Sequence, residues 1–169
     1  MKKIIVLLAL LLVSAQTFAE VSRIYQGRYS GAIRGYDPVA YFTESEAVRG
    51  TRKITYDYLG ATWWFSSEEN KKLFVENPEK YMPQYGGYCA KAMSDNRFLK
   101  IDPKSWSIVN DKLYLNYSSK TRIIWQEQQV QMISTADQNW KVHLKDIFNE
   151  DVAQDIDAES TEVNAALNQ

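Results

Sequence analysis

Cys89 is the only cysteine of the 169-residue chain, and its chemistry stands out first. Met93 follows it by four positions, so both sulfur atoms would lie on one side of a helix. A thiolate and a thioether are soft ligands that suit Cu(I). Asp37, in the turn at residues 35–38, offers a carboxylate to the same site. Cys89, Met93 and Asp37 are therefore the candidate metal ligands, and copper is the candidate cofactor.

Each of these three residues also has an ordinary structural explanation. Free cysteine is among the most buried residue types, methionine fills gaps in hydrophobic cores, and aspartate in a turn often bonds its own backbone. Zinc is not expected, because one cysteine and one histidine cannot supply four Cys or His ligands. The residues alone leave open an inert buried thiol and a soft-metal ligand.

Thiol reactivity is a third explanation for Cys89. The start of a helix, with Lys91 nearby, would stabilise a thiolate that can form a mixed disulfide or a sulfenic acid. Nucleophilic catalysis also needs a base, and the only histidine, His143, lies at the edge of an apolar helix face where a structural role is expected. No serine-hydrolase, phosphate-loop or C-x-x-C motif is present. The sequence favours no enzyme, and a thiol-dependent redox or enzymatic role is the alternative.

The elements that would position these residues are hairpins and short helices. Aromatic and β-branched runs on either side of short turns predict two β-hairpins, at residues 54–65 and 105–117. A buried strand is expected at residues 39–42, after Asp37-Pro38. Helices are expected from a capping box at Ser66 and Glu69, at residues 89–93, at 120–133 and at about 136–148. This order predicts an α+β fold, and the sequence shows no internal repeat.

The N-terminus has the pattern of a signal peptide. A basic start is followed by an apolar run over residues 4–13, and Thr17 and Ala19 are small residues suited to a cleavage site. The run is shorter than the roughly 20 residues that span a bilayer. We expect a signal peptide at residues 1–19, cleavage between Ala19 and Glu20, and a periplasmic or secreted protein with no stable membrane anchor.

The rest of the chain is too acidic to predict a nucleic-acid partner. Two of the 20 basic residues lie in the leader, which leaves 18 against 21 acidic residues and a formal charge of −3. Proteins that bind phosphate backbones carry basic surfaces instead. The aromatic content of 13%, with five tryptophans, predicts an aromatic core that needs no disulfides. The alternative is an aromatic surface that binds a protein partner.

Several stretches, in their order and spacing, resemble the exported bacterial branch of the YHS-domain family. They are GYDPVAYF at residues 35–42, WFSSEEN at 64–70, Phe74 with NPEKY at 77–81, YGGYCA at 85–90, DP at 102–103 and LYLNY at 113–117. The resemblance runs from Arg34 to Trp140. It implies a small treble-clef-like domain of two β-hairpins with short helices, followed by C-terminal helices.

The resemblance also implies a binding role. Some relatives accompany copper-transporting pumps or metal-containing oxygenases, but this chain lacks both the Tyr-His-Ser triplet and the additional cysteines of metal-binding relatives. We expect an exported, non-catalytic binding module whose site gathers Cys89, Met93 and Asp37. Its partner would be a small ligand, a metal ion such as Cu(I), or a protein. The neighbouring tyrosines that would line this site are Tyr36, Tyr85 and Tyr88.

Domain boundaries follow from the resemblance and from composition. A lead-in segment is expected at residues 20–33, and the YHS-like domain with its helical extension at 34–148. Residues 149–169 are acidic and contain no aromatic residue, which predicts a disordered tail.

Overall fold

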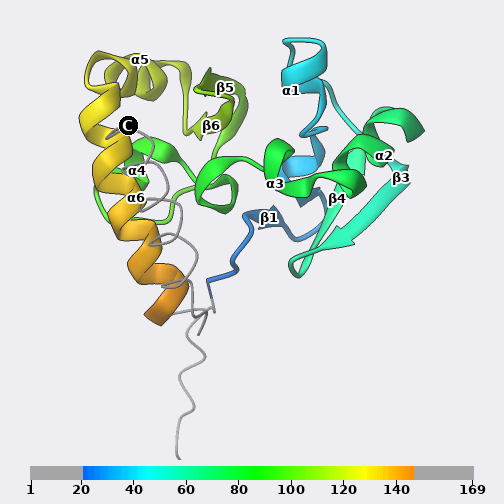
Figure 1. Ribbon diagram of the computed structural model, residues 1–169, viewed down its shortest axis with the longest axis horizontal. Helices are drawn as coiled ribbons and strands as arrows, with labels where there is room; N and C mark the ends of the chain where they lie inside the picture. Colours follow the sequence, from blue (N-terminus) through cyan, green and yellow to red (C-terminus); the bar gives the residue numbers. More distant parts are fainter. Residues whose placement is uncertain (1–20, 147–169) are drawn as a thin grey trace, which may run out of the picture.

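The computed structural model describes residues 21–146. The predicted signal peptide at 1–19 and the predicted acidic tail at 149–169 lie outside these residues. The described chain is α+β: three two-stranded antiparallel hairpins alternate with short helices, and a long helix follows them (Figure 1). The predicted fold class is confirmed. None of the helices between residues 21 and 146 is both long and apolar enough to cross a membrane.

The elements fall into two groups along the chain. Figure 1 shows β3, β4 and α2 on one side of the molecule and β5, β6, α5 and α6 on the other. The first group is β1 (Gln26–Gly27), β2 (Gly31–Ala32), the 3-10 turn η1 (Ile33–Gly35), α1 (Ala40–Thr43), β3 (Thr51–Tyr58), β4 (Ala61–Phe65), α2 (Glu68–Glu76) and α3 (Pro78–Tyr81). The second group is the 3-10 turn η2 (Gln84–Gly87), α4 (Ala90–Ser94), β5 (Asp102–Val109), β6 (Lys112–Asn116), α5 (Ser119–Glu127) and α6 (Gln129–Asp146).

Both predicted hairpins form, and three of their four turn residues, Gly60, Asn110 and Asp111, are types that tolerate a positive φ. Leu59 and Gly60 join β3 to β4 with φ of 51° and 74°, and Asn110 and Asp111 join β5 to β6 with φ of 49° and 57°. Two-residue turns of this kind match the twist of antiparallel strands. A third hairpin, β1 with β2, is much shorter and lies in the lead-in segment, where no strand was predicted.

The strand predicted at residues 39–42 is wrong, since α1 occupies this stretch. The Asp37 carboxylate accepts hydrogen bonds from the backbone N–H groups of Val39 (2.9 Å) and Ala40 (3.4 Å). A side-chain acceptor at this point satisfies the first amides of a helical turn. The apolar character of the run therefore reflects burial of the turn and not a strand.

Two further helix boundaries differ from the prediction. The cap of α2 is Ser67, whose hydroxyl accepts from the Asn70 N–H (3.1 Å), while the Ser66 hydroxyl donates to Asp37. The two C-terminal helices meet at Gln128, several residues earlier than predicted. A serine does cap α2, as predicted, but it is Ser67 and not Ser66.

Aromatic side chains fill most of the interior. The first hydrophobic cluster contains Trp63, Phe65 and Phe74, with the Trp63 and Phe74 rings 5.1 Å apart, and Cys89 also belongs to it. Trp64, which points to the opposite face of β4, is buried as well, at 8% exposure. The second cluster, around Trp125, lies between α4, β6 and α6, and its buried members are Tyr85, Ala90, Met93, Tyr114, Trp125 and Ala136.

The turn η2 depends on a glycine for steric reasons. Gly86 has a φ of 59°, and a Cβ there would lie 1.9 Å from the carbonyl oxygen of Arg23. Its own carbonyl oxygen accepts from the Tyr25 N–H (2.8 Å). Gly60 has a φ of 74°, but a Cβ there would meet nothing within 4 Å.

These two glycines predict different costs for the same substitution. Gly60→Ala should lower the free energy of unfolding by about 1 kcal/mol, from backbone strain alone. Gly86→Ala should lower it by at least about 3 kcal/mol, because the clash with backbone adds to that strain. Urea denaturation followed by tryptophan fluorescence measures both values. Equal costs at the two positions would contradict this account of η2.

Candidate functional site

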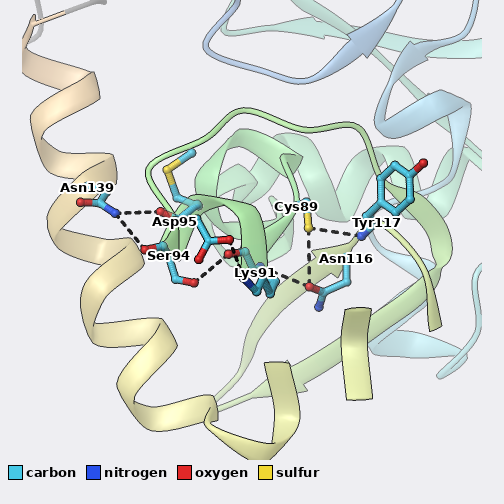
Figure 2. Close-up of polar contacts among 8 residues, drawn as sticks. Cys89, Lys91, Ser94, Asp95, Asn116, Tyr117 and Asn139 are labelled. Carbon is cyan, nitrogen blue, oxygen red and sulfur yellow. Dashed lines mark hydrogen bonds and ion pairs between the residues drawn. The ribbon is translucent and has the colours of Figure 1, made fainter. Parts of the chain in front are cut away.

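The Cys89 sulfur is completely buried, and polar groups from a distant strand hold it. The residue is the N-cap of α4, directly after η2, and its side chain is 0% exposed. Its sulfur accepts from the Tyr117 N–H (3.3 Å), and its thiol donates to the Asn116 Oδ1 (3.7 Å). Figure 2 shows the thiol between these two residues at the end of β6. Cys89 therefore connects the start of α4 to the junction of β6 and α5.

A pocket of about 240 Å³ has Cys89 among its lining residues. Its walls come from α4, from the segment before β5 and from α5, and the lining side chains are mostly apolar. Lys91 and Asp95 form an ion pair at its rim, and both are partly exposed. The remaining lining residues are Cys89, Ala92, Leu99, Tyr117, Thr121 and Ile124. We call this cavity the Cys89 pocket.

The α4 helix that forms one wall is held from two sides. The Lys91 N–H donates to the Asn116 Oδ1 (3.2 Å) at the start of the helix. At its end, the Asn139 amide of α6 donates to the Met93 carbonyl oxygen (2.8 Å). Figure 2 shows Asn139 beside Ser94, whose carbonyl oxygen also accepts from this amide (3.4 Å). The pocket wall next to the thiol is thus fixed by hydrogen bonds to both β6 and α6.

The surroundings keep Cys89 in its neutral form. Burial raises the pKa of the Cys89 thiol above its ordinary value, and this effect exceeds the opposing influence of the Ala92, Tyr117 and Lys91 backbone amides and of the Lys91 charge. Burial disfavours the charged form of any acid. The predicted thiolate at a helix N-terminus is therefore not what this site stabilises.

Asp37 forms a separate, closed site. Besides the two amides of α1, its Oδ2 accepts from the Ser66 N–H (2.8 Å), the Ser66 hydroxyl (2.6 Å) and the Asn70 side-chain amide (2.8 Å). Asp37 is 0% exposed, and Asn70 is also buried. Both carboxylate oxygens are thus occupied by donors of the protein itself, which explains how a carboxylate is tolerated in this interior.

The predicted copper ligands do not form one donor set. Asp37 and Cys89 have different polar partners, and the Met93 side chain packs in the second hydrophobic cluster while Cys89 belongs to the first. Among residues 21–146, no group of three or more His, Cys, Asp and Glu side chains is placed to hold a metal ion. These contacts do not fit a preformed copper site, and copper binding at Cys89 alone stays a prediction.

The three predicted binding tyrosines serve mainly in packing. The Tyr88 hydroxyl donates to the Ser22 carbonyl oxygen (2.8 Å), and the Tyr85 hydroxyl donates to Asp137 on α6 (2.8 Å). Tyr36 is half-buried, with the Arg49 guanidinium 5.8 Å from its ring centroid. None of the three lines the Cys89 pocket.

Sequence reasoning missed the residues that surround Cys89 from α5 and β6. Thr121 and Ile124 line the pocket, and Asn116 accepts from the thiol; none carries a catalytic or metal-binding pattern, and they become neighbours of Cys89 only through the fold. Asn116 is the one with a recognisable signal. It is a polar residue directly after the apolar run Leu113-Tyr114-Leu115, and a buried polar residue needs a partner.

Comparison with known proteins finds one family model that matches part of this chain. Residues 39–85 match the family model of the YHS domain. The YHS match extends from the residue before α1 to the second residue of η2, so Asp37, Cys89 and the Cys89 pocket lie outside it. No curated protein and no solved structure matches the chain.

The burial of Cys89 predicts slow reaction with thiol reagents. In the native protein at pH 7.5, alkylation by iodoacetamide should be at least about 100-fold slower than in 6 M guanidinium chloride, because both access and thiolate fraction are low. The native rate should increase as pH rises toward the raised pKa. Mass spectrometry of timed samples measures the modified fraction. Labelling of the folded protein at the rate of the denatured protein would contradict this placement of the thiol.

The Asp37 network predicts a large effect of one substitution. Asp37→Ala removes the acceptor for five hydrogen bonds and should lower the free energy of unfolding by at least about 3 kcal/mol, because buried donors lose their partner. Asp57→Ala is the matched control, since Asp57 is exposed and accepts one hydrogen bond from Thr62 (2.6 Å). The control should cost less than about 1 kcal/mol. Denaturant unfolding measures the free energy of unfolding of both variants. Similar losses in the two variants would reject the structural role of Asp37.

Proposed function

We propose that the chain is an exported, non-catalytic binding module of the YHS type whose site is the Cys89 pocket. The observation that carries this proposal is the mostly apolar pocket of about 240 Å³ lined by Cys89, whose buried thiol has a raised pKa. Concave apolar cavities with a few polar groups are the usual form of small-ligand sites. The signal-peptide pattern at residues 1–19 supports export to the periplasm or beyond.

The lining of the pocket supports a small apolar ligand. Ala92, Leu99 and Ile124 offer apolar contact, and the Lys91–Asp95 ion pair leaves no free charge at the rim. The cavity is smaller than the roughly 300 Å³ at which pockets begin to hold drug-sized molecules. Its proposed occupant is therefore one aromatic or branched aliphatic group, either as a free molecule or as a side chain of a protein partner.

Exposed apolar residues next to the pocket favour the protein partner as a second candidate. Tyr117, Ile123 and Ile124 are 45%, 54% and 40% exposed, and Tyr117 and Ile124 also line the pocket. Apolar surface that continues from a cavity onto an exposed helix is a common form of interaction site. A partner that places one side chain in the pocket would cover α5 at the same time.

The chemistry of Cys89 supports binding over the thiol-dependent alternative. A raised pKa reduces the thiolate fraction, and the hydrogen-bond partners of the thiol, the Asn116 side chain and the Tyr117 amide, include no base. Copper(I) at this thiol would need a second soft ligand, and Met93 packs in the other cluster. An anaerobic Cu(I) titration of the wild type and Cys89→Ser tests that prediction.

Indole is a suitable probe for the proposed pocket. Titration of indole into the isotope-labelled protein should shift the amide resonances of residues 89–95 and 117–124, with saturation in the millimolar range, as expected for a fragment-sized ligand. Thr121→Phe places a ring in the cavity and should abolish these shifts. Ile123→Phe is the matched control, because Ile123 lies on the same helix outside the pocket. Shifts that survive Thr121→Phe, or that never saturate, would reject the pocket as the site.

A protein partner and a free molecule are distinguished by the outer face of α5. If the pocket receives a side chain of a partner protein, Ile123→Asp should weaken association with that partner while indole binding is unchanged. If the natural ligand is a free molecule, Ile123→Asp should leave its binding unchanged, and indole binding as well.

A further inference from the structure

The two long hairpins are paired in the same way at a constant sequence offset. In the first, Thr51 lies opposite Phe65 and Tyr58 opposite Ala61; in the second, Asp102 lies opposite Asn116 and Val109 opposite Lys112. Every one of these positions differs from its counterpart by 51 residues. Both hairpins also contain a register irregularity at the same place, between Thr51 and Thr55 and between Asp102 and Trp106. Such irregularities are specific features of a strand pair.

The helices that follow the hairpins correspond at the same offset. Both α2 and α5 contain nine residues, Glu68–Glu76 and Ser119–Glu127. Their N-caps are Ser67 and Ser118, which accept from the N–H of Asn70 (3.1 Å) and of Thr121 (3.2 Å). Each helix buries one aromatic side chain at the same position, Phe74 and Trp125, both 0% exposed.

The segments before the hairpins also correspond, at an offset of 52. Each begins with a 3-10 turn in which three consecutive residues have positive φ, namely Ile33, Arg34 and Gly35 in one segment and Tyr85, Gly86 and Gly87 in the other. A tyrosine and then Asp37 or Cys89 follow this turn, and a short helix, α1 or α4, comes next. The stretches between the short helix and the hairpin, residues 44–50 and 95–101, are equal in length, so the second segment is one residue shorter between Cys89 and the end of α4 than the first is between Asp37 and the end of α1.

Asp37 and Cys89 make the same long-range contacts in the two segments. The Asp37 N–H donates to the Val48 carbonyl oxygen (2.9 Å), and the Cys89 N–H donates to the Leu99 carbonyl oxygen (3.1 Å). The Asp37 Oδ2 accepts from the Ser66 N–H (2.8 Å), and the Cys89 sulfur accepts from the Tyr117 N–H (3.3 Å). The residue numbers of the corresponding partners, Val48 and Leu99 or Ser66 and Tyr117, again differ by 51.

We propose that residues 33–76 and 85–127 are two copies of one structural unit, in which Cys89 takes the place of Asp37. Cys89 is then a positioning residue: its sulfur is the acceptor that connects a short helix to the strand–helix junction behind it. This assignment explains why a free thiol is 0% exposed, and it stands whether or not the Cys89 pocket binds a ligand.

The same correspondence explains why the second unit contains a pocket. In the first unit, the side chains of Ser66 and Asn70 close the space beside Asp37. Their counterparts are Tyr117, whose side chain is 45% exposed, and Thr121, whose hydroxyl bonds that of Ser118 (2.9 Å). Neither side chain reaches the thiol with a polar atom, and the Cys89 pocket occupies the corresponding position.

Cys89→Ser and Cys89→Val test the role of the sulfur as an acceptor. Both substitutions leave a side chain of similar size, but only serine can accept from the Tyr117 N–H. Cys89→Val should lower Tm by roughly 5 °C more than Cys89→Ser does, because the buried amide loses its partner. Hydrogen exchange of the Tyr117 amide should be accelerated at least about tenfold in Cys89→Val and not in Cys89→Ser. If valine is tolerated as well as serine by both measures, the thiol serves as an apolar filler and the proposal is wrong.

A transplant of the first network into the second unit tests the equivalence of the two units. Cys89→Asp alone should be strongly destabilising, because its second oxygen lacks the hydroxyl and amide donors. Adding Tyr117→Ser and Thr121→Asn supplies the counterparts of Ser66 and Asn70, and should raise Tm by roughly 5 °C or more over Cys89→Asp. The control is Tyr117→Ser with Thr121→Asn in the presence of Cys89, where no such gain is expected. The proposal is wrong if the two added substitutions raise Tm no more with Asp at position 89 than with Cys89. It is also wrong if neither aspartate variant folds.

Discussion

The structure depends on two buried hydrogen-bond acceptors, the side chains of Asp37 and Cys89. Each of them joins three parts of the chain. Asp37 and Cys89 each follow a turn with positive φ, begin a short helix and accept an N–H from a residue 29 or 28 positions further along. Contacts of this separation are costly to form in an unfolded chain, because the intervening segment must close into a loop. Once formed, they fix the short helix, the hairpin and the following helix relative to one another.

The two acceptors differ in what they demand of their surroundings. A carboxylate in the interior needs several donors, and Ser66 and Asn70 provide them to Asp37. A thiol is satisfied by one amide and one weak contact, as Cys89 shows with Tyr117 and Asn116. The second unit is therefore free to carry apolar residues where the first needs polar ones, and this freedom leaves room for the Cys89 pocket.

The sequence predicted the parts of the fold that local chemistry controls. Gly60 and the pair Asn110-Asp111 correctly indicated the two hairpin turns, and the family motifs indicated the order of hairpins and helices. The prediction failed at residues 39–42, because an apolar run of four residues does not distinguish a strand from a helical turn whose first amides bond to Asp37. It also misplaced the α2 cap, since Ser66 and Ser67 have the same local signal and only the contact with Asp37 separates them.

The site and the internal correspondence were beyond sequence reasoning for a different reason. Between residues 51–76 and 102–127, the identical pairs at an offset of 51 are Lys53 with Lys104, Ser67 with Ser118 and Glu76 with Glu127. The two segments are similar in strand register, in the sign of φ at their turns and in the position of their helix caps. Many different side chains are compatible with these backbone features. Cys89 and Asp37 themselves have different chemistry, so their equivalence appears only in their hydrogen bonds.

The first hydrophobic cluster has a consequence for how the chain unfolds. It combines Phe65 and Phe74 from one unit with Cys89, Leu113 and Leu115 from the other. A two-stranded hairpin is marginal by itself, and neither long hairpin pairs with another sheet within residues 21–146. Melting of either unit would expose the apolar face of its neighbour to water. We therefore expect the two units to unfold in one cooperative transition and neither to fold by itself.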